Sequence, residues 1–169
     1  STLAAAYAPQ AVSANVPARF VVPFPAGGAA DVMARVIVDA LKDDIGQTII
    51  IDNRPGASTR VAAEYVKNAP PDGNTVLMTL MDTMVLAPMV YNNLRYNPEK
   101  DFAPITSVAE ITYGIAVNAS SPYQTLDDYI KAAKTDRKVA SALGVSGLGS
   151  VLHFVAYDFT RQSGADMSI

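Results

Sequence analysis

The stretch RFVVPFPAGGAAD, residues 19–31, joins a short apolar run to two glycines and then to small residues. Its first part, residues 19–24, is typical of a strand buried inside a parallel sheet. After the glycines, apolar residues recur at spacings of three and four, which predicts a helix containing Val32, Met33, Val36, Ile37, Ala40 and Leu41. The stretch therefore predicts a strand, a glycine turn and a helix, which together form the first unit of an α/β fold.

The same alternation continues along the first eighty residues. Residues 48–51 form a β-branched run that predicts a second strand buried on both faces. A second helix is expected around residues 61–66 and a third strand at residues 75–79. Short connections and right-handed crossovers make this a doubly wound α/β unit.

Beyond the third strand we expect a short helix at residues 84–90, interrupted by Pro88. A loop at residues 96–104 and a long extended segment at residues 105–117 follow. The composition turns polar at residues 118–122, and we place a boundary between two lobes there.

A second α/β pattern begins after this boundary and is not finished. Thr125 and Asp128 match a capping box, and the apolar face of the helix comprises Leu126, Tyr129, Ile130 and Ala133. We expect a strand at residues 139–143, a glycine-rich loop, a helix at residues 150–162 and the opening of another strand at residues 166–169.

Composition excludes several classes of protein. Of 169 residues, 50% are hydrophobic and 17% are charged, which excludes a disordered chain or a coiled coil. A net charge of -3 without a basic cluster argues against a nucleic-acid partner. With no Cys and one His, zinc fingers, iron–sulfur clusters and His-rich metal sites are excluded, so we expect no metal and no cofactor. No apolar run approaches the ~20 residues that span a bilayer, so no membrane-spanning segment is expected.

The first residues are small, uncharged and weakly apolar, and Val12-Ser13-Ala14 resembles a signal-peptidase cleavage site. Either they are the remnant of an export signal, or they form an Ala-rich terminus without that function. The first interpretation predicts a periplasmic protein. The expected layout is a leader at residues 1–17, a first lobe at 18–117 and the start of a second lobe at 118–169.

Two loops, residues 23–31 and 144–150, share one construction: each leaves a strand, passes through glycines and opens a helix. Amides at a helix start attract anions, so two such loops facing each other could hold a carboxylate without Arg or Lys. Alternatively, the glycines serve tight packing. Neither the dinucleotide pattern G-x-G-x-x-G nor a P-loop is matched.

An enzymatic alternative is an α/β hydrolase that uses Ser146 and His153. Leu148, however, occupies the position where a nucleophile elbow requires Gly. His153 has no obvious orienting carboxylate, as is typical of a structural hydrogen-bonding histidine. We therefore expect a protein that is not an enzyme.

Five motifs occur in order: VPFPAGGAAD at 22–31, DNRPGA at 52–57, APPDG at 69–73, YNPEKDFAPI at 96–105 and GVSGLGSVLH at 144–153. This combination resembles the periplasmic solute-binding proteins of tripartite tricarboxylate transporters, or Bug receptors. The resemblance implies a periplasmic-binding-protein-like (type II) two-lobed Venus flytrap, here with an incomplete second lobe. It also implies a receptor that binds a small organic carboxylate between its lobes and delivers it to a membrane permease.

The resemblance assigns ligand contacts to three loops. The contacts carried over are Phe24, Ala26, Gly27, Gly28 and Thr83 in the first lobe, and Ser146, Gly147, Gly149 and Ser150 in the second. Asp82 departs from the family's pattern. If it faces the cleft, it would repel a second carboxylate, and a monocarboxylate or zwitterion would be favoured; alternatively, it caps the short helix near Thr83.

Two further departures are that Tyr157 replaces a Glu common in the family, and that family members are nearly twice as long. A truncated form without a transport function is therefore a further alternative.

Overall fold

The computed structural model describes residues 16–140, 143–145, 147 and 149–169. The described chain divides into two compact units. The first comprises the residues up to Met84 together with Asn93–Phe102, and the second comprises Val85–Asn92 and Ala103–Ile169. This division falls earlier than the expected boundary at residue 118, because residues 103–117 add no strand to the sheet of the first unit. The assignment of residues 18–117 and 118–169 to two lobes stays a prediction.

The first unit contains a parallel sheet of three strands, β1 (Ala18–Val22), β2 (Ile49–Asn53) and β3 (Thr75–Leu77), in the order β2-β1-β3. Phe20 of the central strand is in register with Ile51 on one side and Val76 on the other. Val21 and Val22 are fully buried and form the centre of this unit's core. The three strands lie where the sequence predicted them.

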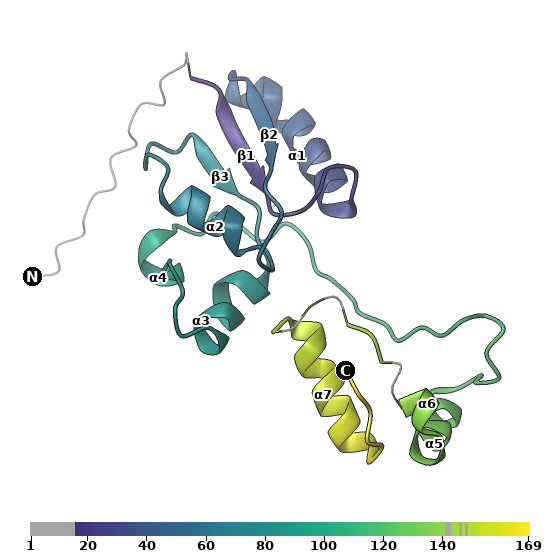
Figure 1. Ribbon diagram of the computed structural model, residues 1–169. Helices are drawn as coiled ribbons and strands as arrows, with labels where there is room; N and C mark the ends of the chain where they lie inside the picture. Colours follow the sequence, from purple (N-terminus) through teal and green to yellow (C-terminus); the bar gives the residue numbers. More distant parts are fainter. Residues whose placement is uncertain (1–15, 141–142, 146, 148) are drawn as a thin grey trace, which may run out of the picture. The chain divides into compact units, whose positions relative to one another are not determined.

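Two helices connect these strands, α1 (Ala29–Ile45) and α2 (Arg60–Lys67). The first crossover moves from β1 to one neighbour and the second returns past β1 to the other. Right-handed crossovers in opposite directions place the connecting helices on opposite faces of a sheet, and α1 and α2 lie on opposite faces here (Figure 1). The predicted doubly wound α/β unit is confirmed.

One detail of the predicted burial is wrong. Ile50 is 41% exposed because β2 lies at an edge of the described sheet instead of inside it. Val32 and Val36 of α1 are more than half exposed, whereas Ala34 is fully buried. The buried stripe of α1 is therefore narrower than its apolar residues suggest.

The expected short helix at residues 84–90 is present as a π-helix, η1 (Asp82–Leu86), followed by α3 (Ala87–Val90) with Pro88 in its first turn. The loop expected at residues 96–104 contains a helical turn, α4 (Pro98–Asp101). This turn forms because Asn97 accepts hydrogen bonds from the amides of Glu99 and Lys100, and because Pro98 is suited to the first helical position.

The second unit contains α5 (Leu126–Thr135), α6 (Arg137–Ala140) and α7 (Val151–Ser163). Its core comprises Tyr129, Ala133, Ala140, Ala165 and Met167. The capping box is confirmed, since the Thr125 side chain accepts from the Asp128 amide and Asp128 accepts from the Thr125 amide. Of the predicted apolar face of α5, Tyr129 and Ala133 are buried, whereas Leu126 is 49% exposed.

The strand predicted at residues 139–143 is also wrong in its first half, since Val139 and Ala140 belong to α6. The side chain of Asp136 accepts from the amide of Lys138 and so favours this helical turn. Residues 141–142 lie outside the described residues. The final residues form no strand in the described part, although the Ser168 amide donates to the Ala140 carbonyl at 2.9 Å.

The segment at residues 103–117 has no regular secondary structure and its side chains are exposed. Ile105, Val108, Ile111, Tyr113, Ile115 and Val117 are among the most exposed large hydrophobic residues described.

Candidate functional site

The carboxyl ends of β1, β2 and β3 meet at one edge of the sheet. The chain leaves β1 toward β2 and then crosses to β3 on the other side, which makes the β1–β3 boundary a topological switch point. Ligands of open α/β sheets bind outside the carboxyl ends of the strands at such a point. The loops that begin after Val22 and Leu77 therefore lie where ligands bind in folds of this kind. That they contact a ligand stays a prediction.

Asp31 ties the first of these loops together from inside α1. It is 2% exposed, and it accepts hydrogen bonds from the Gly27 amide at 2.9 Å and from the Asn53 side chain at 3.0 Å. The Arg35 guanidinium pairs with both of its oxygens, at 2.9 and 3.2 Å. Asn53 also donates to the Phe24 carbonyl at 3.0 Å. One carboxylate thus links the loop after β1, the end of β2 and the first turns of α1.

The electrostatics of this cluster keep Asp31 ionised. The hydrogen bonds from Arg35, Gly27 and Asn53 lower the pKa of Asp31 from 3.8 to about 2, outweighing the effect of burial. Asp31 therefore has a structural function: it fixes the loop. Asn53, the last residue of β2, is a member of the cluster that sequence reasoning missed.

The first loop offers the predicted residues in different ways. Gly27 has φ of 84°, a conformation that favours glycine, and its amide donates to Asp31. Phe24 is half-buried, while Ala26, Gly27 and Gly28 are exposed. These three residues therefore form the outward-facing part of the loop, although the Gly27 amide is already used in its internal support.

Thr83 holds the loop after β3 to the loop after β2. Its side chain is 1% exposed and its hydroxyl is hydrogen-bonded to that of Thr59. Its carbonyl accepts from the buried Tyr96 hydroxyl at 2.6 Å. Asp82 is half-buried at the start of η1. Whether it faces a ligand stays a prediction.

The loop after β2 has an unusual backbone. Ala57, Ser58 and Thr59 have φ values of 46°, 52° and 74°, so three consecutive non-glycine residues are left-handed. Each such residue costs roughly 1–2 kcal/mol relative to a right-handed conformation. The turn places Thr59 at the start of α2, where its hydroxyl reaches Thr83. Strain of this kind gathers at functional sites.

The glycine loop of the second unit is supported in the same manner as the first. The Gly149 amide donates to Nδ1 of His153 at 3.0 Å, and Gly149 has φ of 78°. The Ser150 hydroxyl donates to the Gly147 carbonyl at 2.7 Å and accepts from the His153 amide at 3.2 Å. Ser150 is the N-cap of α7. Ser146, a predicted ligand contact and candidate nucleophile, lies outside the described residues.

The two glycine loops thus share one hydrogen-bonding pattern. In each, a glycine with positive φ precedes the N-cap, and its amide donates to the side chain at the third helical position. That side chain is Asp31 in α1 and His153 in α7. The two turns are therefore built alike, which the shared sequence construction suggested without showing the acceptors.

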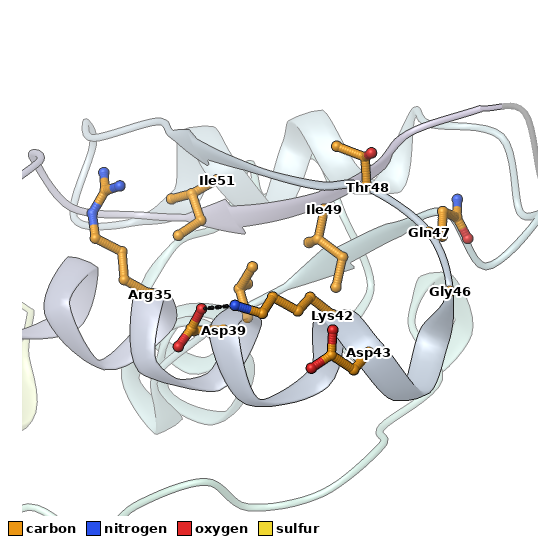
Figure 2. A pocket seen from close by; sticks show the side chains of 10 residues that line it. Arg35, Asp39, Lys42, Asp43, Gly46, Gln47, Thr48, Ile49 and Ile51 are labelled. Carbon is orange, nitrogen blue, oxygen red and sulfur yellow. Dashed lines mark hydrogen bonds and ion pairs between the residues drawn. The ribbon is translucent and has the colours of Figure 1, made fainter.

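A groove on the first unit lies away from these loops (Figure 2). It is an open groove of about 840 Å³ between α1 and the edge strand β2, and it includes Gly46 and Thr48 at the amino end of β2. Lys42 and Asp39 on its wall form an ion pair at 2.7 Å. None of the expected ligand contacts lines it, so it is separate from the glycine loops.

Within the described residues, no group of three or more His, Asp or Glu side chains is arranged to hold a metal ion. Among the helices of that same part of the chain, none combines the length and the apolar character needed to cross a bilayer.

These features define an α/β protein of the periplasmic-binding-protein class, with carboxyl-edge glycine loops at its candidate site. Two solved structures resemble it. The R. palustris protein Rpa4515, determined with adipate, is 34% identical with a TM-score of 0.79, over 90% of this chain and 50% of that one. MatC from Rhodopseudomonas palustris, determined with bound malate, is 28% identical with a TM-score of 0.69, over 91% of this chain and 52% of that one.

A relative from Bordetella bronchiseptica, described as a UPF0065 protein, is 37% identical over 136 residues, which are 80% of this chain and 41% of the relative. The family described as "Tripartite tricarboxylate transporter family receptor" matches residues 33–169. The chain belongs to this family, as its motifs predicted. It spans about half the length of the proteins that it matches, so the second lobe is incomplete, as expected.

Proposed function

We propose that the chain is the binding part of an extracytoplasmic solute receptor that holds a small organic carboxylate and delivers it to a tripartite tricarboxylate-type membrane transporter. The observation that carries this proposal is the pair of matching glycine turns, each fixed by a side chain from the helix that it opens. Family membership and the adipate and malate of the two solved neighbours support it.

The binding chemistry we propose uses backbone amides. The turn at Ala26 and Gly28 opens α1, and the turn at Gly147–Ser150 opens α7, so each can direct peptide amides and a helix dipole at a carboxylate. Charge-assisted hydrogen bonds contribute about 1.5–3 kcal/mol each, so a few of them hold an anion without a cationic side chain. Phe24 supplies an apolar wall, and Thr83 supports the loop after β3.

In the whole receptor, a ligand that contacts both lobes stabilises the closed state, so closure is a shift of population without covalent chemistry. The periplasmic location and the permease partner belong to this same proposal. They follow from the family, whose description names a transporter receptor.

The preferred ligand depends on Asp82. We propose that this carboxylate faces the bound solute, repels a second ligand carboxylate and favours a monocarboxylate or a zwitterion. Adipate and malate, bound by the two neighbours, each carry two carboxylates and are therefore the natural competitors in a test.

Isothermal titration of the purified chain tests the proposal. The affinities of the wild type, Asp82→Asn and Glu99→Gln are compared for citrate, adipate, malate, benzoate and alanine. Glu99 lies on the exposed turn α4 and serves as the matched control for loss of one charge. A ligand at 100 times its Kd adds about 2.7 kcal/mol of stability, which gives a parallel thermal-shift signal. We expect a monoacid or zwitterion to bind more tightly than citrate, and Asp82→Asn to narrow that gap.

A wild type that binds none of these acids contradicts the receptor proposal. A wild type that prefers citrate, unchanged by Asp82→Asn, contradicts only the specificity.

A further inference from the structure

His153 is the only histidine in the chain, and the structure gives it a definite hydrogen bond. Its Nδ1 lies 3.0 Å from the Gly149 amide nitrogen and accepts that N–H. A ring nitrogen that accepts a hydrogen bond carries no proton, so the neutral imidazole has its proton on Nε2. His153 is therefore held in one tautomer by the backbone of the glycine turn.

The Gly149 turn requires glycine at this position, and hydrogen bonds hold the residues on either side of it. With φ of 78°, Gly149 is in a conformation that other residues avoid, and a Cβ at this position would lie 3.1 Å from the Tyr91 hydroxyl. Ser150 fixes the neighbouring part of the turn through the Gly147 carbonyl and the His153 amide. Of these hydrogen bonds, only the one to Nδ1 depends on the protonation of a side chain.

We propose that neutral His153 is a positioning residue for solute binding, because it fixes the second glycine turn, and that solute affinity falls when the imidazole takes up a second proton. The proposal rests on the proposed receptor function. Protonation puts a hydrogen on Nδ1, which then faces the N–H of Gly149 as a second donor. The hydrogen bond is lost, and the turn is no longer held in the arrangement that directs its amides at a carboxylate.

The other turn provides the internal comparison. Asp31 has the same position in α1 and accepts the equivalent Gly27 amide, but Arg35 and Asn53 keep it ionised far below neutral pH. Near His153, the Tyr91 hydroxyl lies beside Gly149, and Tyr157 lies one turn along α7. Farther along α7, Asp158 pairs with Arg161 at 2.8 Å. Histidines as a class change charge between pH 8 and 5, so the two turns are compared over that range.

Nitrogen-15 NMR of the full 169-residue chain without solute tests the hydrogen bond directly, and the single histidine makes the imidazole signals unambiguous. At pH 8 we expect the tautomer protonated at Nε2 and a Gly149 amide protected from exchange. Its protection should fall at least about fivefold on acidification to pH 5.5, while that of Gly27 is unchanged. A tautomer protonated at Nδ1, or a Gly149 amide that exchanges freely at pH 8, overturns the proposal.

Benzoate affinity at pH 8 and 5.5 tests the effect on solute binding, measured for the wild type, His153→Asn and His153→Ala. Asn places a neutral acceptor near the position of Nδ1 and does not titrate, so His153→Asn also controls for the change in charge of benzoate itself. Relative to His153→Asn, the wild type should lose about fivefold to tenfold in affinity at pH 5.5. His153→Ala should bind about as weakly at pH 8 as the acidified wild type.

Equal pH dependence of the wild type and His153→Asn overturns the proposal. If the wild type binds no acid at pH 8, the receptor function fails, and the NMR tautomer alone then decides whether His153 fixes the turn.

Discussion

Tyr96→Phe is the substitution whose effect follows most directly from the packing at the carboxyl edge of the sheet. The Tyr96 side chain is 5% exposed, and its hydroxyl donates to the Thr83 carbonyl at 2.6 Å. Its ring also meets Phe102 edge-on, with centroids 5.8 Å apart. Phe keeps the ring and its contact with Phe102, so the substitution removes only the hydroxyl.

The expected cost comes from the carbonyl that remains. Leaving a buried acceptor without its donor costs about 1–3 kcal/mol, and Thr83 is 1% exposed, so water cannot easily replace the hydroxyl. We expect the free energy of unfolding to fall by about 1–2 kcal/mol. For a chain of this size the loss corresponds to a Tm lower by roughly 2–8 °C. Equilibrium urea unfolding followed by circular dichroism measures it.

Tyr113→Phe is the matched control, because Tyr113 is 45% exposed in the irregular segment at residues 103–117. It should change stability by less than about 0.5 kcal/mol, as is usual for surface substitutions. If Tyr96→Phe is as harmless as Tyr113→Phe, the hydroxyl does not support Thr83, and the account of the loop after β3 is wrong.

Three further predictions concern the supports of the site. Ser58→Gly should raise the free energy of unfolding by about 0.5–1 kcal/mol, because Ser58 has φ of 52°, whereas Ser107→Gly in the irregular segment should bring no gain in the same urea assay. The pKa of Asp31 is lowered to about 2, so its contribution to stability is complete above about pH 4 and is lost as pH falls toward 2. The free energy of unfolding of Asp31→Asn should therefore fall less between about pH 4 and 2 than that of the wild type. An equally steep fall in both proteins would contradict the stabilising function of the Asp31 cluster. Thr125→Ala should destabilise α5 by about 1 kcal/mol, seen as faster hydrogen exchange of its amides, and unchanged exchange would exclude the capping box as a support.

The order of elements in the first unit could be predicted because hydrophobic periodicity and glycine turns are local signals. The β1 run, the helix after Gly28 and the β-branched run of β2 each depend on residues close together in the chain. The same holds for the Thr125–Asp128 capping box. Burial was harder to predict than the order of elements. Whether Ile50 is covered depends on whether another strand lies beside β2, and this is set by the strand order of the sheet.

Local hydrogen bonds also overrode the predicted pattern in two places. Asn97 and Pro98 start a helical turn inside an expected loop, and Asp136 favours a helix over the expected strand at Val139. In both cases a short polar side chain satisfies backbone amides, which hydrophobic periodicity does not register.

The candidate site was predictable as two glycine loops but not as a set of contacts. Asn53 supports the first glycine loop from β2, and Thr59 and Tyr96 support the loop after β3, and only the fold brings these side chains there. A signal was nevertheless present: Asp31 and His153 each lie four residues after a loop glycine, the spacing at which a helical side chain reaches back to the preceding turn.

The most direct measurement is a benzoate titration of the 169-residue chain followed by amide chemical shifts. If the carboxylate is held by peptide groups, the largest changes will fall on the backbone of residues 26–30 and 147–151. Changes confined to the groove between α1 and β2, or no saturable change at millimolar benzoate, would contradict the claim that the glycine turns hold the anion.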